Sequence, residues 1–211
     1  GPICHSATEP NFIERVDIFM RAIKFGSVAE WHIGPEPIPI SKFQWIDMDA
    51  TGGMTSTTKA IELLLSELDI EKIGKRNVPP VIILLSDGMC TDEPETLYYE
   101  ALNKLNQSPW GKKAVRIAIG IGDQNNDYNK EQLDCFISPY LRLKQNVETF
   151  PASDARMLMK YIEVLSLVAT QASSQSQGEG EDMESPVVLP PIDVADGDGP
   201  DFSQLSANDV F

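Results

Sequence analysis

The stretch Val81–Thr91, which reads VIILLSDGMCT, decides the fold. Its five apolar residues follow Pro79-Pro80 as a short unbroken run, which predicts a strand buried on both faces, as in an open parallel sheet. The run ends in Ser86-Asp87-Gly88, so Asp87 is predicted to lie at the carboxyl end of a central strand. Open α/β sheets bind their ligands at that end. The stretch therefore predicts an α/β fold and makes Asp87 a candidate functional residue.

Strand and helix patterns alternate on both sides of this stretch. Val16–Phe25 has the alternation of a long strand near a sheet edge, and Ala29–Ile33 is predicted to return as its hairpin partner. Gly34–Pro39 (GPEPIP) predicts an extended surface connection. The other predicted elements are a helix with Ile61, Leu64, Leu65 and Leu68 on one face, a helix over Leu97–Leu105, a strand over Ala114–Gly120, a helix over Asn129–Phe136, a strand over Val147–Phe150 and a helix over Ala155–Ala169. Such alternation is typical of a layered α/β fold with right-handed crossovers.

Composition divides the chain into three segments. Residues 1–15 are predicted to be a linker or a truncated end, residues 16–169 the domain, and residues 170–211 a disordered acidic tail rich in Ser, Pro and Gly. Nine of the 32 carboxylates lie in this tail, which has no Lys or Arg, and the formal net charge is −15. That charge argues against nucleic-acid phosphates as a ligand. We also expect no membrane span, and the three cysteines predict free thiols in a cytoplasmic protein.

A second polar loop, Asp49–Thr55 (DATGGMT), precedes a predicted helix, and Ser56-Thr57-Thr58 offer hydroxyls as its N-caps. A hydroxyl from one loop and a carboxylate from a neighbouring loop would form half of an oxygen site for a hard cation such as Mg²⁺, Mn²⁺ or Ca²⁺. The alternative is that Thr55 only caps its helix and that Asp87 only accepts backbone hydrogen bonds in its own turn. Spacing alone leaves both interpretations open.

Four segments in order, FxSxAEWHIGP, TGGMTSTTKAIELL, VIILLSDGMCTD and VRIAIGIG, resemble the von Willebrand factor A (vWA) domain. More narrowly, they resemble its bacterial tellurite-resistance-type branch, in which the domain is often encoded with a kinase and a phosphatase. The resemblance covers Val16–Val168 and implies a three-layer, Rossmann-like sheet flanked by helices. It also implies a metal-ion-dependent adhesion site, in which three loops hold a divalent cation and a partner's carboxylate completes its shell.

The resemblance assigns roles to particular residues. Thr55 matches the family's single threonine ligand, and Asp87 matches its second-loop aspartate, which usually acts through water. Gly53, Met89 and Asp92 belong to the same two loops and are expected to contact the partner. For Asp92 there is an alternative, because Asp92-Glu93 can also begin the following helix.

The family's first loop, Asp-x-Ser-x-Ser, does not occur in this sequence. It should follow an apolar strand ahead of Val16, and Gly1–Glu14 is too short and too polar to hold that strand and its helix. We therefore expect a truncated sequence or a partial reading frame. Val187–Val194 is a poorer candidate for the gap, because Pro190-Pro191 suit a central strand badly. Since the absent loop supplies most of the expected ligands, weak divalent-metal binding or none is expected.

Other groups carry weaker predictions. Asp193–Gly199 resembles part of an EF-hand loop, but its ligand positions align poorly, so a solvated acidic tail is preferred. His5 and His32 lack a catalytic motif around them, and His32 is interpreted as a packing residue of the hairpin. Cys90 has no nearby basic residue, which favours an inert thiol. Trp110 lies in a predicted loop and is equally a core anchor or a contact residue.

The resemblance predicts a non-enzymatic protein-binding module that engages a partner carboxylate through a cation. It places the module in a bacterial stress or tellurite-resistance-type system, with a kinase or phosphatase as partner. The alternative is a metal-dependent hydrolase or phosphotransferase, which needs a nucleophile or an acid–base pair that the matched loops lack apart from Asp87. In a third interpretation the acidic tail is the functional segment. It would dock a basic partner or be modified at Ser173, Ser174 or Ser176.

Overall fold

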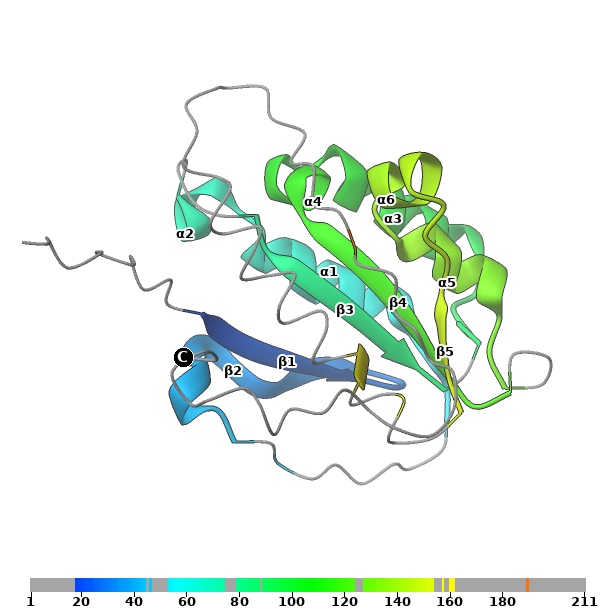
Figure 1. The fold of residues 1–211 in the computed structure, drawn as a ribbon, viewed down its shortest axis with the longest axis horizontal. Coiled ribbons are helices and arrows are strands. Elements are labelled where there is room, and N and C mark those ends of the chain that lie inside the picture. The colour runs from blue at the N-terminus through cyan, green and yellow to red at the C-terminus, as the bar shows by residue number, and fades with distance from the viewer. Residues whose placement is uncertain are drawn as a thin grey trace, which may run out of the picture.

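The computed structural model describes residues 18–44, 46, 53–74, 79–87, 89–123, 127–153, 157, 160–161 and 189. This part of the chain is a mixed α/β structure with an antiparallel hairpin and a three-stranded parallel sheet flanked by helices (Figure 1). None of the helices in these ranges is long and apolar enough to cross a membrane. The predicted segment 1–15 lies outside the described residues.

The predicted hairpin is confirmed. Strand β1 spans Phe19–Phe25 and pairs antiparallel with β2, which spans Ala29–Pro39 and leads into a short 3-10 helix, η1, over Ile40–Lys42. Strand β2 is longer than the predicted Ala29–Ile33, because the proline-rich run after it stays extended and pairs again with the start of β1. Prolines lack the N–H that a central strand needs, so such a run suits a strand at a sheet edge.

The parallel sheet has the order β3-β4-β5, with β3 at Val81–Ser86, β4 at Val115–Ile121 and β5 at Phe150–Ala152. Residue Ser86 lies opposite Gly120, and because the strands are parallel their carboxyl ends meet at one edge, here called the carboxyl edge. The strand prediction for Val81–Ser86 is confirmed, but its central position is not. Among the strands that the structure describes, β4 is the central one, and it is more deeply buried than β3. The last strand begins and ends later than the predicted Val147–Phe150.

Six α-helices have both of their ends within the described ranges, and three of them were not predicted. The helices are α1 at Thr57–Glu67, α2 at Ile70–Ile73, α3 at Thr96–Gln107, α4 at Pro109–Lys113, α5 at Lys130–Phe136 and α6 at Pro139–Lys144. Helices α2, α4 and α6 are too short to show a periodic apolar face. Their signals are caps: Asp69 accepts from the Glu71 N–H, Ser108 accepts from the Gly111 N–H, and Pro139 occupies the first turn of α6.

The predicted loop around Trp110 is therefore wrong. Trp110 lies in α4, is 3 % exposed, and donates its Nε1–H to the carbonyl of Gly74 at 3.1 Å. Of the two roles left open for this residue, core anchor is the one that the structure shows.

The core lies where the parallel sheet meets its helices, and α1 also packs against α3 and the hairpin. Its most deeply buried apolar side chains include Ile61, Leu105, Ile117, Ile119, Phe136 and Ile137. Of the predicted final helix, the structure describes Met157, Lys160 and Tyr161, all helical. Of the predicted tail it describes Leu189, which packs against this core and donates its N–H to Gln145 Oε1 at 3.2 Å.

A charged side chain also lies in this core. Arg116, in the middle of the sheet, is 1 % exposed, donates Nη2–H to Asn106 Oδ1, and lies 5.8 Å from the centroid of the Phe136 ring. Its Nε and Nη1 have no hydrogen-bond partner in the described part of the chain. Burial lowers the pKa of Arg116 to about 10. An incompletely paired guanidinium in an apolar core costs stability.

We therefore expect Arg116→Met to raise the free energy of unfolding by about 1–2 kcal/mol, because methionine fills similar volume without a charge to desolvate. Urea unfolding followed by circular dichroism measures the change. As a control, Asn106→Ala should destabilise the wild type and have little effect in the Arg116→Met background. A loss of stability in Arg116→Met would show that the guanidinium is well paired.

Candidate functional site

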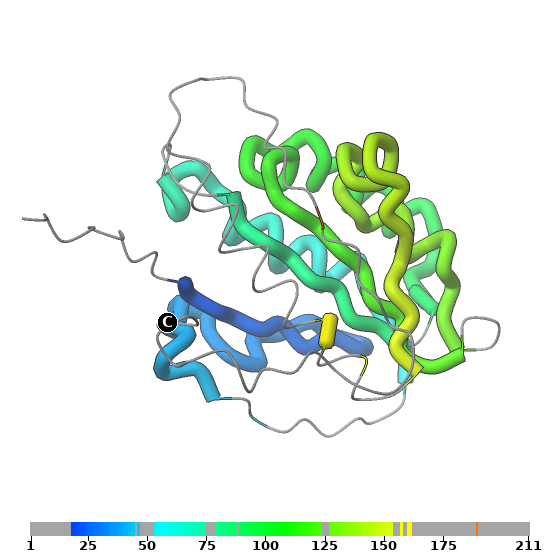
Figure 2. The backbone as a smooth tube through the Cα atoms, in the orientation of Figure 1, coloured from blue at the N-terminus to red at the C-terminus, as the bar shows by residue number. Residues whose placement is uncertain are grey.

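Three loops are joined by backbone hydrogen bonds at the carboxyl edge. They are the hairpin turn (residues 26–28), the loop before α1 (residues 53–56) and the loop after β3 (residues 87 and 89–92), together called the three-loop face. The Ser56 N–H donates to the Gly26 carbonyl at 2.8 Å. Thr55 and Thr91 are joined twice: the Thr91 N–H donates to the Thr55 carbonyl at 2.9 Å, and the Thr55 N–H donates to Thr91 Oγ1 at 2.7 Å. Figure 2 shows the hairpin turn, the start of α1 and the ends of β3 and β4 at the same end of the molecule.

The two predicted metal ligands therefore lie in loops that bind each other. Asp87 is exposed and directly follows Ser86, which is level with Gly120 in the sheet. Thr55 is partly buried between its two hydrogen bonds to Thr91. The structure brings the two loops together, and a shared cation between Thr55 and Asp87 stays a prediction.

Asp92 lies at the N-terminus of α1. Its Oδ1 accepts from Ser56 Oγ at 2.5 Å, and its Oδ2 accepts from the Thr58 N–H at 2.8 Å and from Cys90 Sγ at 2.9 Å. Burial alone would raise the pKa of Asp92, but the hydrogen bonds from Cys90, Ser56 and Thr58 outweigh it and lower the pKa below its usual value. A carboxylate at this position also faces the positive end of the helix dipole.

Two capping predictions are corrected by this arrangement. Asp92-Glu93 does not begin the following helix, because α3 begins at Thr96 with Glu95 at its N-cap. Ser56, at the N-cap of α1, makes no side-chain capping bond among the described residues and instead donates its hydroxyl to Asp92. An ionised carboxylate is a stronger acceptor than a hydroxyl, so Asp92 takes the capping role from a distant part of the sequence.

The Cys90 thiol lies beside this carboxylate. Burial raises its pKa, and the hydrogen bond that it donates to Asp92 raises it further. A thiol with a raised pKa is protonated at neutral pH and is a poor nucleophile, in agreement with the inert thiol that we predicted.

A residue that sequence reasoning missed, Gln132, holds the loop after β3 from the other side. The Cys90 N–H donates to Gln132 Oε1 at 3.3 Å, and Gln132 Nε2–H donates to Glu95 Oε1 at 3.2 Å. The Tyr98 hydroxyl donates to the Gln132 carbonyl at 2.7 Å, which anchors α5 on α3. Gln132 belongs to α5, 42 positions from Cys90, so no local pattern points to it. The loop after β3 is therefore positioned by both α1 and α5.

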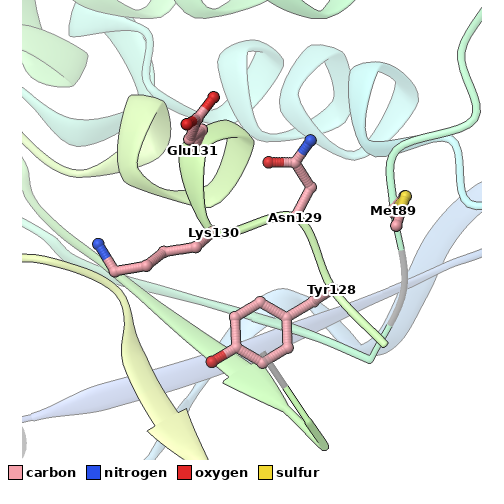
Figure 3. Close-up of a pocket in the computed structure, with 5 residues that line it drawn as sticks. All are labelled: Met89, Tyr128, Asn129, Lys130 and Glu131. Atoms are coloured by element: carbon pink, nitrogen blue, oxygen red, sulfur yellow. The ribbon is translucent and has the colours of Figure 1, made fainter. Parts of the chain in front are cut away.

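A shallow depression beside this loop is lined by Met89, Tyr128, Asn129, Lys130 and Glu131 (Figure 3). Figure 3 shows Tyr128 and Lys130 extending to the same side, away from Met89, whereas Glu131 points in another direction. Lys130 Nζ lies 2.8 Å from Asp134 Oδ2 and 3.0 Å from Glu148 Oε2, so its charge is used in ion pairs. Among the lining residues described, Lys130 is therefore engaged by neighbouring carboxylates.

The predicted cation has two predicted ligands on the three-loop face, Thr55 and Asp87. Within the described ranges no group of three or more His, Cys, Asp or Glu could hold a metal ion. Thr55 and Asp87 would supply two oxygens, whereas Mg²⁺ and Ca²⁺ take six or more ligands. Asp92, the nearest further carboxylate along the chain, already accepts three hydrogen bonds.

Comparison with known proteins adds no family. No protein-family model matches the chain, and no curated protein matches its sequence. The vWA resemblance therefore rests on the four sequence segments alone.

The remaining candidates are structural or lie outside the described residues. His32 lies in β2 with Nε2 2.6 Å from the Ile46 carbonyl oxygen, as expected for a residue that packs the hairpin. A Cβ at Gly53 would meet no atom within 4 Å, so no packing in the described part requires glycine there. His5, the EF-hand-like Asp193–Gly199 and the tail serines lie outside the described residues.

Proposed function

We propose that this chain is a non-enzymatic protein-binding module of the vWA type, with a three-layer arrangement, and that the three-loop face is its binding surface. The observation that carries the proposal is the double hydrogen bond between Thr55 and Thr91. It holds the hydroxyl-bearing loop against the loop of Asp87 at the carboxyl edge, where open α/β sheets bind their ligands.

The geometry of this region favours binding over catalysis. Asp92 is engaged in capping α1, the pKa of the Cys90 thiol is raised by burial, and Lys130 of the neighbouring depression is held in ion pairs with Asp134 and Glu148. A hydrolase or phosphotransferase would need a nucleophile and a base within hydrogen-bond reach of one reacting atom. Nothing observed on this face favours that alternative.

The cellular setting of the proposal comes from the resemblance. It implies a cytoplasmic bacterial protein of a stress or tellurite-resistance-type system, with a kinase or phosphatase as partner. It also implies a cation bridge to a partner carboxylate. Because Thr55 and Asp87 alone supply too few oxygens, we propose that this chain binds Mg²⁺, Mn²⁺ or Ca²⁺ weakly or not at all.

The metal prediction is tested by calorimetric titration of the purified chain. Mg²⁺ and Mn²⁺ are expected to show no saturation below about 1 mM, the range of weak sites with few protein ligands. Micromolar binding that Asp87→Ala abolishes would contradict the prediction and would show that the missing ligands are supplied elsewhere in the chain.

The binding proposal is tested by capture of a kinase and a phosphatase chosen as candidate partners, the two classes of partner that the resemblance implies. Wild-type protein should retain at least one of them, and Asp87→Ala and Thr55→Ala should reduce the retained amount severalfold. Glu62→Ala, which removes an exposed carboxylate from α1 outside the three-loop face, is the matched control. Equal capture by all four proteins would place the binding surface elsewhere.

A further inference from the structure

The three-loop face carries exposed apolar side chains as well as the exposed carboxylate of Asp87. Each of the three loops contributes one: Val28 is 62 % exposed, Met54 is 58 % exposed and Met89 is 50 % exposed. The loops are tied together by the bonds between Ser56 and Gly26 and between Thr55 and Thr91, so these side chains belong to one surface. Gathered exposed apolar groups mark interaction sites, and methionine adapts to varied partners.

The charge of this surface is negative. Asp87 and Glu93 are exposed, and Asp92 is partly exposed. Among the described residues, Lys59 is a positive group close to these loops, and its Nζ donates to the Ser27 carbonyl of the hairpin turn at 2.5 Å. Since we propose that this chain binds divalent ions weakly or not at all, the exposed Asp87 carboxylate is accessible to a positive group of the partner.

Resting on the proposed function, we propose that the three-loop face docks a protein segment in which a basic residue stands between large aliphatic residues. The ammonium or guanidinium group pairs directly with Asp87, and the aliphatic side chains pack on Met54 and Met89. The apolar contact supplies most of the affinity, and the exposed ion pair supplies specificity, since surface pairs contribute little energy. Binding of this kind needs no metal.

The test is an NMR titration of the ¹⁵N-labelled full chain with three synthetic peptides in Gly-Ser flanks, which differ only in their cores: Leu-Lys-Leu, Leu-Glu-Leu and Ser-Lys-Ser. In EDTA, the Leu-Lys-Leu peptide should shift the amide signals of residues 53–56 and 89–92. The Leu-Glu-Leu and Ser-Lys-Ser peptides should leave them unchanged. NMR detects millimolar binding, so a weak complex is still observed.

Variants then separate the two contacts. Asp87→Asn should weaken the Leu-Lys-Leu complex about threefold, the effect of losing one exposed ion pair. Combined Met54→Ser and Met89→Ser should weaken it about tenfold, as for loss of the apolar anchors. Leu143→Ser is the control, since Leu143 is 71 % exposed in α6, away from the three-loop face.

Three outcomes would overturn the inference. The first is binding of the Leu-Glu-Leu peptide that requires Mg²⁺, which would instead support a cation bridge and leave the proposed function standing. The second is binding of the Leu-Lys-Leu peptide with signal changes outside the three-loop face. The third is no response to any peptide; if kinase or phosphatase capture still depends on Asp87, this inference fails while the proposed function holds.

Discussion

Asp92→Ala should lower the free energy of unfolding by about 3 kcal/mol. The substitution removes the acceptor of three hydrogen bonds, from Ser56 Oγ, the Thr58 N–H and Cys90 Sγ, and leaves the first turn of α1 without its cap. Urea unfolding monitored by circular dichroism measures the loss. Asp92→Asn should lower the free energy of unfolding by less than Asp92→Ala does, because its carbonyl oxygen can still accept from the Thr58 N–H. Some loss remains, because its amide group cannot accept from Ser56 Oγ.

The same carboxylate gives stability a defined pH dependence. The folded pKa of Asp92 is lower than the unfolded value of about 3.9, so its contribution is present above that value and is lost as the pH falls through the folded pKa. The stability difference between wild type and Asp92→Ala should therefore be constant near neutral pH and shrink below about pH 4. A difference that is unchanged down to pH 2, or a difference below about 0.5 kcal/mol at pH 7, would contradict the capping role.

Gly111→Ala is the second substitution with a large expected effect. A Cβ at Gly111 would lie closer than 3.0 Å to the Leu105 carbonyl oxygen, to Ser108 Oγ and to Leu105 Cδ1. The Leu105 oxygen belongs to the backbone of α3, and the Ser108 hydroxyl both donates to it and accepts from the Gly111 N–H, so neither can move without breaking a contact. We expect a loss of about 3 kcal/mol, at the upper end of overpacking costs.

Gly53→Ala is the matched control for Gly111→Ala. No described atom lies within 4 Å of a Cβ at Gly53, so the expected change in stability is within about 0.5 kcal/mol. Both variants are measured by the same urea titration. If Gly111→Ala has the same urea midpoint of unfolding as the wild type, the contact between α4 and the end of α3 is looser than the structure indicates.

Local patterns predicted the elements whose signals are local. The apolar run that begins at Val81 and the one that ends at Gly120 predicted the strands β3 and β4, because short runs of Val, Ile and Leu bounded by turn residues are typical of buried strands. The helical spacing of Ile61, Leu64, Leu65 and Leu68 likewise predicted α1. Helices α2, α4 and α6 were missed because each spans six residues or fewer, which is too short for a periodic face.

The candidate site was predicted in part. The motifs identified the loops of Thr55 and Asp87, since a carboxylate after an apolar strand and a run of hydroxyl residues before a helix can be read directly from the chain. The partners of Asp92 in α1 could not be read in this way, because Ser56 and Thr58 lie 36 and 34 positions away from it in the sequence. The local interpretation, a start for the next helix, was the wrong one.

By itself, the sequence determined the alternation of strands and helices and the two loops that carry polar chemistry, because periodicity and turn residues act over a few neighbouring positions. Only the tertiary structure decided that β4 is the central strand of the parallel sheet described, that Asp92 caps α1, and that Gln132 supports the loop after β3. These features depend on strand order and helix packing, which bring together residues more than 30 positions apart.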